Sequence, residues 1–420
     1  MYSIRLILSL LVVSWSSHAL NIHDIFPEDV VREARLGEHN EDFGLNIIQF
    51  LEKYGYPIES HEVTTEDGYI LTMHRIPHGR NETGILATST KKPAVFLMHG
   101  LLCSSMDWVN AGPTRSLALN LADAGYDVWL GNNRGNTWSR KHVVLDPDVD
   151  KEFWDYSFDT CGYYDLPAEI DYVLNATGLE KLNYVGHSQG TSEFFALASL
   201  RPEYNEKITL MVALAPIAYM QNLTQPLVLF LANYTTLFDI VMEQLGIHEI
   251  FPSSPLLVEV LDILCREGSE YQDLCIDLIF FLTGPDMPQM DRSFMEVAIS
   301  NTPAGISARM LSHYLQEIQS GYFRRYDYGL KNFEIYKQLS PPSYNVSLIT
   351  SPVALYYARN DRLAAIYNVE QFASELPNLV MKNLIEFELF NHLDFLWATD
   401  VKTLVNDDVV ALLNNHNHVS

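Results

Sequence analysis

The sequence LNYVGHSQGTSEFF, residues 182–195, predicts a short strand over residues 183–185, a sharp turn and the start of a helix. Gly186, Ser188 and Gly190 give the turn the pattern G-x-S-x-G. A serine in such a turn has a crowded backbone, and glycines two positions away on either side let neighbouring segments approach. The turn presents the serine oxygen as a nucleophile at the end of the strand. Because any loop with two glycines and a serine gives the same letters, the surroundings must decide.

Short apolar runs alternate with helix-like stretches on both sides of this turn. A hairpin with the turn Glu66-Asp67-Gly68 comes first, within residues 61–76. Continuous apolar strands between helices predict a mostly parallel sheet with helices on both faces, an α/β fold. The predicted strands are 94–98, 126–130, 208–214, 352–358 and 384–389, and the predicted helices include 116–124 and 158–177.

The alternation stops over residues 216–345, where helix formers, Phe, Leu and Met prevail and no run resembles a central strand. We therefore expect a large helical insertion within the sheet domain. Helices with wide apolar faces beside the catalytic edge of a sheet favour a cap and lid over an apolar pocket. In the alternative interpretation, these faces only pack on one another.

The first residues, MYSIRLILSLLVVSWSSHA, are typical of a signal peptide, because an early arginine precedes a short apolar run and small residues close it. An N-terminal core strand is the alternative. Since no later run is apolar enough to span a bilayer, we expect no integral membrane segment in the mature form. The predicted organisation is signal peptide 1–19, N-terminal arm or pro-segment 20–41, first part of the core 42–215, helical cap and lid 216–346, second part of the core 347–414 and polar tail 415–420.

The composition indicates an acidic globular protein. The formal net charge is -26 and the sequence pI is near 4.8. Such a charge argues against nucleic acid and against an anionic membrane as an electrostatic partner. Work at acid pH, where many carboxylates are neutralised, and simple solubility explain the charge equally well. A hydrophobic content of 48% allows a large buried core.

Cysteines and sequons suit a secretory route, which permits disulfides. Cys265 and Cys275 are close in sequence and are the favoured pair, while Cys103 and Cys161 can remain reduced and buried. Chance alone supplies some N-x-S/T sequons, so only part of them is expected to carry glycan. The sequons stand at Asn81, Asn175, Asn222, Asn233 and Asn345.

A serine nucleophile needs a histidine base, and the base needs an acid that fixes its tautomer. In sheet hydrolases of this kind the chain order is Ser, Asp or Glu, His. Asp361 follows the strand predicted at 352–358, and His392 follows the one predicted at 384–389, so both belong at the C-terminal edge of the sheet. The predicted triad is Ser188, Asp361 and His392. Asp394 is a rival acid, disfavoured because it is only two residues from the histidine.

A tetrahedral oxyanion requires two N–H donors. The amide of Gln189, directly after the nucleophile, supplies one. The loop after an early strand supplies the second through the amide of Leu101, which Gly100 allows to turn inwards. His99 and His187 flank the site, and we expect them to pack or to shape loops.

These motifs resemble the acid lipase family, which includes gastric, lysosomal and many insect lipases. The resemblance covers residues 40–400 and implies an α/β-hydrolase core with a helical cap, the triad and oxyanion hole named above, a disulfide matching Cys265–Cys275, and activity without a metal or cofactor. The matching stretches are HGLL (99–102), LADAGYDVWLGNNRGNTWSRKH (121–142), EFWDYSFD (152–159), YDLPAEIDYVL (164–174), YVGHSQGT (184–191), AGISARMLSHYLQ (304–316), YDYG (326–329) and NHLDFLWATD (391–400).

The sequence therefore predicts a serine lipase that cleaves the ester bonds of neutral lipids, triacylglycerols or sterol esters, at a lipid–water interface. We expect it to be secreted, with the lysosome as the alternative destination. A short-chain carboxylesterase and a non-catalytic lipid carrier are the rival functions. Acyl-chain preference and oligomeric state leave no signal in the sequence.

Overall fold

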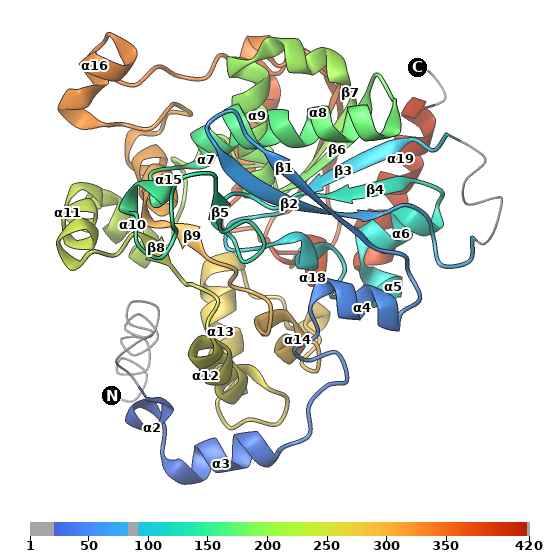
Figure 1. Cartoon of the computed structure of the whole chain (residues 1–420), viewed down its shortest axis with the longest axis vertical. Coiled ribbons are helices and arrows are strands. Elements are labelled where there is room, and N and C mark those ends of the chain that lie inside the picture. Colours follow the sequence, from blue (N-terminus) through green and yellow to red (C-terminus); the bar gives the residue numbers. More distant parts are fainter. Residues whose placement is uncertain (1–20, 83–90, 418–420) are drawn as a thin grey trace.

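The computed structural model describes residues 21–82 and 91–417 (Figure 1), so the predicted signal peptide lies outside the described residues. A nine-stranded sheet runs in the order β1-β2-β4-β3-β6-β7-β10-β11, with β5 paired to β2. Neighbouring strands along the run β4-β3-β6-β7-β10-β11 are parallel, whereas β2 is antiparallel to β1, β4 and β5. The strands are β1 (Glu59–Thr64), β2 (Tyr69–Ile76), β3 (Ala94–Met98), β4 (Asp127–Leu130), β5 (Lys141–His142), β6 (Leu182–His187), β7 (Ile208–Leu214), β10 (Val353–Tyr357) and β11 (Leu379–Leu384).

Helices cover both faces of the sheet, with α8 and α9 on one side and α6 and α19 on the other (Figure 1). Strands β3, β6 and β10 are consequently buried at every residue, which explains their continuous apolar sequences. The helix predicted over 158–177 is α7, a π-helical turn and α8 in succession. The helices of the core are α4 (Ile47–Lys53), α5 (Gly112–Arg115), α6 (Leu117–Asp123), α7 (Phe158–Thr160), α8 (Leu166–Thr177), α9 (Gln189–Leu200), α17 (Ile366–Glu375), α18 (Asp394–Trp397) and α19 (Asp407–Asn417).

The predicted position of the last strand is wrong. We expected it at 384–389, but β11 spans Leu379–Leu384, and residues 385–390 form bends and turns. The predicted stretch, LIEFEL, alternates apolar and polar residues from Ile385 on, whereas LVMKNL at 379–384 does not, so the local pattern favours the wrong stretch. Pairing decides, because the end of β10 lies opposite Leu384. His392 therefore follows the sheet by a longer loop than predicted.

The chain between β7 and β10 is largely helical and adds no strand to the large sheet in the part that the structure describes. No single described helix is long and apolar enough to cross a membrane; only α10 and α11 together, bent by 77°, reach that length and composition. The elements are α10 (Pro226–Asn233), α11 (Thr235–Leu245), β8 (Glu249–Ile250), α12 (Pro255–Cys265), α13 (Gln272–Thr283), α14 (Met295–Ile299), β9 (Ile306–Ser307), α15 (Ala308–Ser320) and α16 (Asn332–Tyr336).

The N-terminal arm is helical and packs against this insertion. Its helices, α2 (Ile22–Ile25) and α3 (Glu28–Leu36), lie beside α12 at the bottom of Figure 1. Phe26 and Val31 are buried in a second hydrophobic cluster that includes the disulfide Cys265–Cys275. The predicted disulfide is thus confirmed, and Cys103 and Cys161 are free and buried.

Candidate active site

Ser188 sits on the sharp turn between β6 and α9, where the sequence placed it. Its φ of 51° and ψ of -117° are strained for a residue with a side chain, as expected of a nucleophile elbow. The amide of Ser188 donates to the carbonyl oxygen of Leu214 on the neighbouring strand β7, at 3.0 Å. The turn is therefore anchored to the sheet, and α9 begins at the next residue.

The glycines on either side of the serine are dictated by close packing. A Cβ on Gly186 would lie 2.8 Å from the backbone of Gly190, and one on Gly190 would lie 2.4 Å from the carbonyl oxygen of Met98 at the end of β3. The spacing G-x-S-x-G is therefore a steric requirement of this turn.

His392 lies between Ser188 and Asp361. Its Nδ1–H donates to the Asp361 carboxylate, at 2.8 Å from Oδ2 and 3.0 Å from Oδ1. With the proton on Nδ1, Nε2 is free to accept from the Ser188 hydroxyl, whose oxygen is 2.8 Å away. The amides of Leu363 and Ala364 both donate to Oδ1 of Asp361 and fix the carboxylate. Such a chain can transfer the serine proton to the imidazole.

The rival acid, Asp394, is not bonded to the imidazole. Its Oδ2 accepts from the amide of Asn391 at 2.6 Å, within the loop that carries His392. Asp361 is consequently the acid that the structure brings to the histidine, although the two acids are both buried.

The amides predicted for the oxyanion hole flank the serine. Gln189 is the first residue of α9, so its amide belongs to the unpaired N-terminus of that helix. Leu101 follows Gly100, whose α-carbon packs so closely on the elbow that a Cβ there would lie 3.2 Å from that of Ser188. Within the described residues, neither amide donates a hydrogen bond to another group. Both are available to a negatively charged oxygen.

The comparisons with known proteins cover most of the chain. The family described as "alpha/beta hydrolase fold" matches residues 93–399, and the "partial alpha/beta-hydrolase lipase region" matches residues 47–112. Lipase 3 of Drosophila melanogaster is 43% identical over 87% of this chain and 92% of its own. The chain belongs to the acid lipase family. Bovine gastric triacylglycerol lipase is 40% identical over 89% of this chain and 92% of its own.

Two further comparisons agree with this family. Lysosomal acid lipase/cholesteryl ester hydrolase of Macaca fascicularis is 38% identical over 90% of this chain and 92% of its own. Among solved structures, a protein from Sulfolobus solfataricus superimposes with a TM-score of 0.53 at 15% identity, covering 85% of this chain and 94% of its own, which shows the α/β-hydrolase fold alone.

The two histidines beside the site of this lipase-family chain both bond to loop backbone. Nδ1–H of His99 donates to the carbonyl oxygen of Gly100 at 2.8 Å, and its Nε2 accepts from the amide of Asn133 at 3.2 Å. Nε2–H of His187 donates to the carbonyl oxygen of His392 at 3.0 Å. Burial lowers the pKa of His99 to about 4. Loop shaping, as predicted, describes both residues.

Sequence reasoning missed a buried acid behind the nucleophile, Glu193. It lies one turn after Gln189 on α9, and its Oε1 accepts from Gln189 Nε2 at 2.9 Å and from Asn133 Nδ2 at 2.7 Å. Burial raises the pKa of Glu193 well above its ordinary value. A lone acid on the otherwise uncharged and almost fully buried helix QGTSEFFALASL is the signal that would have found it.

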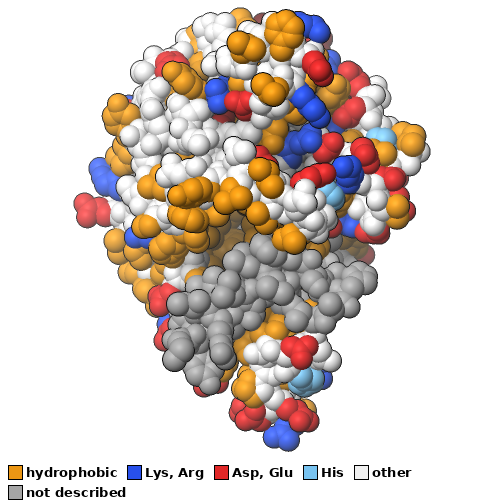
Figure 2. All heavy atoms as spheres, turned by 90° about the vertical axis from the view of Figure 1, so that its left-hand side faces the viewer, with side chains coloured by type: hydrophobic (Ala, Val, Ile, Leu, Met, Phe, Trp, Pro, Cys, Tyr) orange, Lys and Arg blue, Asp and Glu red, His pale blue; other side chains and the backbone are white. Residues whose placement is uncertain are grey.

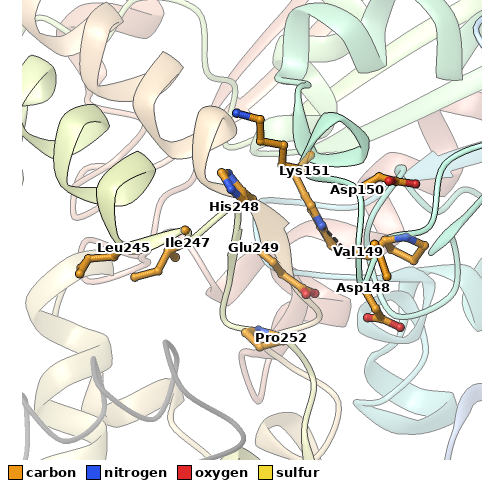
Figure 3. Close-up of a pocket in the computed structure, with 12 residues that line it drawn as sticks. Asp148, Val149, Asp150, Lys151, Leu245, Ile247, His248, Glu249 and Pro252 are labelled. Atoms are coloured by element: carbon orange, nitrogen blue, oxygen red, sulfur yellow. Dashed lines mark hydrogen bonds between the residues drawn. The ribbon is translucent and has the colours of Figure 1, made fainter.

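A hollow lies at the seam between the insertion and the core (Figure 3). Its volume is about 550 Å³, and residues 147–151 face residues 245–249 across it. Arg140 of the core pairs with Glu249 there, at 2.5 Å. The lining includes Asp148, Asp150 and Lys151 and no triad residue, so this polar hollow does not suit an acyl chain.

One group with metal-ligand spacing occurs among the described residues, formed by His39, Asp262 and Glu296. His39 Nδ1 is 3.3 Å from Glu296 Oε2 and 3.5 Å from Asp262 Oδ1. His39 belongs to the N-terminal arm and the two acids belong to the insertion, so the cluster joins these two segments. The group contains no triad residue.

Proposed function

We propose that this acid lipase family member is a serine lipase that hydrolyses carboxylic ester bonds of neutral lipids, triacylglycerols or sterol esters. The observation that most directly supports this proposal is the hydrogen-bonded chain from Ser188 through His392 to Asp361, next to two free backbone amides. Relatives named gastric triacylglycerol lipase and lysosomal acid lipase/cholesteryl ester hydrolase support this substrate class. They also support a secreted or lysosomal destination.

The geometry supports hydrolysis in two steps. His392 takes the proton of the Ser188 hydroxyl through Nε2 while Oγ attacks the ester carbonyl, and the amides of Leu101 and Gln189 stabilise the oxyanion. Asp361 stabilises the imidazolium. The imidazolium then protonates the departing alcohol, which leaves an acyl-enzyme. His392 next deprotonates a water molecule that releases the fatty acid and restores the serine.

Helices α10 and α11 offer a surface for contact with lipid. Large apolar side chains on this pair are 50–58% exposed, and hydrophobic side chains gather on the corresponding face in Figure 2. An apolar surface of this kind on a water-exposed helix pair is costly unless it meets another apolar phase. We call it the α10–α11 face. Its residues are Leu227, Phe230, Tyr234, Leu237, Ile240 and Leu245.

Hydrolysis of trioleoylglycerol and cholesteryl oleate emulsions, at acid and at neutral pH, tests the proposal. We expect cleavage by the native chain and none by Ser188→Ala, which should fold normally. Cleavage of short soluble esters alone would assign a carboxylesterase. Absence of any ester cleavage, with lipid still bound, would assign a carrier and reject the proposal.

A further inference from the structure

Residues 283–286 of the insertion lie between the two loops that carry the acid and the base. They begin at the last residue of α13 (Gln272–Thr283) and contact both the loop of Asp361 and the loop of His392. We call residues 283–286 the cap strap.

The cap strap holds the histidine loop through its backbone. The carbonyl oxygen of Thr283 accepts from the amide of His392 at 3.4 Å, and that of Gly284 accepts from Asn391 Nδ2 at 2.9 Å. Asn391 in turn folds its own loop, because its Oδ1 accepts from the amide of Leu393 at 2.8 Å. The backbone of the base is therefore fixed from the side of the insertion.

The same cap strap holds the acid loop. Asn360 Nδ2 donates to the carbonyl oxygen of Pro285 at 2.9 Å and to that of Leu389 at 2.6 Å. Gly284 has a φ of 114°, and a Cβ there would lie 2.0 Å from the carbonyl oxygen of Asn360. Only glycine lets the two backbones approach this closely.

A pair of buried acids closes the contact. Asp286 of the cap strap is 1% exposed and Asp394 is 6% exposed, their carboxyl groups lie within reach of a hydrogen bond to each other, and Oδ2 of Asp286 has no other hydrogen-bond partner among the described residues. Two carboxyl groups can share such a bond only if one carries a proton. The remaining oxygens are tied down, since Asp394 accepts from the amide of Asn391 and Asp286 accepts from that of Gln289.

We propose that Asp286 and Asp394 are positioning residues, and that the proton they share clamps the cap strap to the loop of His392. The inference rests on the proposed function, because it concerns the reactivity of Ser188. Neither acid bonds to the reacting side chains. Loss of the shared proton leaves two carboxylates in contact, whose repulsion moves the histidine loop away from Ser188 and Asp361.

The surroundings favour retention of this proton. Asp286 and Asp361 face Asp394, and Asp291 lines the same small cavity. Burial, together with the neighbouring carboxyl group of Asp286, raises the pKa of Asp394 to about 9. Burial also raises the pKa of Asp286. Because the folded-state pKa is raised, the clamp is complete below the ordinary carboxyl pKa. Its contribution is lost as the pH rises through the folded-state value.

Labelling of Ser188 by an organophosphonate ester, followed from about pH 4 to about pH 10, tests the clamp directly. The labelling rate of the native chain should fall on the basic side. Asp394→Asn replaces the shared proton with an N–H, so its basic limb should move up by at least about one pH unit. Asp394→Ala should label about 10–100-fold more slowly at every pH, because the base is displaced. Asp291→Asn, a charge change in the same cavity, should keep the native profile.

Two outcomes would overturn the proposal: an unshifted basic limb in Asp394→Asn, or native labelling by a folded Asp394→Ala. Should Asp394→Ala not fold, Asp286→Asn replaces it, and a native profile in that variant also rejects the shared proton. Labelling needs the triad and no lipid. A chain that labels normally but cleaves no emulsion therefore refutes the proposed substrate and leaves the clamp testable.

Discussion

Nε2–H of His187 donates a hydrogen bond to the carbonyl oxygen of His392 at 3.0 Å. His187 directly precedes the nucleophile, so this bond joins the elbow to the loop of the base. Burial, helped by the neighbouring His392, lowers the pKa of His187 to about 3. The imidazole therefore stays neutral through most of the acid range, and its Nε2–H keeps donating to the His392 carbonyl oxygen.

Removal of this bond should slow catalysis without unfolding the chain. In His187→Ala the backbone of His392 loses a partner, and we expect kcat on a soluble ester to fall about tenfold. His187→Gln can donate from its amide and should recover part of the loss. His78→Ala serves as the control. Unchanged kcat in His187→Ala would show that the cap strap alone fixes the loop.

The closest packing at the elbow predicts a large effect of Gly190→Ala. The new Cβ would lie 2.4 Å from the Met98 carbonyl oxygen, which belongs to the backbone of a buried strand and cannot turn aside. The free energy of unfolding should drop by about 1–3 kcal/mol and ester hydrolysis should be lost. Gly44→Ala, where no atom lies within 4 Å, should cost less despite its φ of 72°. Denaturant titration compares the two variants.

Substitutions on the α10–α11 face should lower the hydrolysis of emulsified substrate and leave the hydrolysis of dissolved substrate unchanged. Phe230→Ser combined with Leu237→Ser should lower the hydrolysis of emulsified trioleoylglycerol at least about tenfold, because less apolar area enters the lipid. Hydrolysis of a soluble short ester should not change. Leu36→Ser with Val380→Ser, exposed apolar residues outside the insertion, gives the control. An equal loss on both substrates would place these side chains in the acyl pocket instead.

Glu193 predicts greater stability at acid pH. Its folded-state pKa is raised by burial, so its contribution is complete below the ordinary carboxyl pKa and declines as the pH rises towards the folded-state value. The decline from one group is at most about 1.4 kcal/mol per pH unit. Glu193→Gln keeps an acceptor for Asn133 and should flatten the fall of the thermal midpoint between acid and neutral pH. Glu203→Gln, on the surface, should leave that slope unchanged.

Local patterns predicted those parts of the molecule whose structure is set locally. The elbow is a steric motif, and the buried strands β3 and β7 coincide with their apolar runs, residues 94–98 and 208–214. Strand β11 was misplaced because pairing with β10, which the sequence does not show, overrides the local alternation that favoured residues 384–389.

The contacts that hold the triad from outside could not be predicted either. Asp286 and Asp394 are far apart in sequence, and they meet only because the insertion folds back on the sheet edge. No periodicity or spacing marks such a pair. The sequence singled out Asp394 only as a rival acid for the triad, because it lies close to His392, and showed no sign of its contact with Asp286.

The hydrogen bonds that Asn360 and Asn391 donate to carbonyl oxygens of residues 283–286 limit how such a protein can be recombined. An insertion transplanted from another hydrolase would have to supply carbonyl oxygens at the same two points, or the acid and the base would lose their alignment. The insertion and the sheet therefore depend on each other and should be exchanged only together. Variation in substrate choice should accumulate through side chains on the insertion before it comes from exchange of the insertion as a whole.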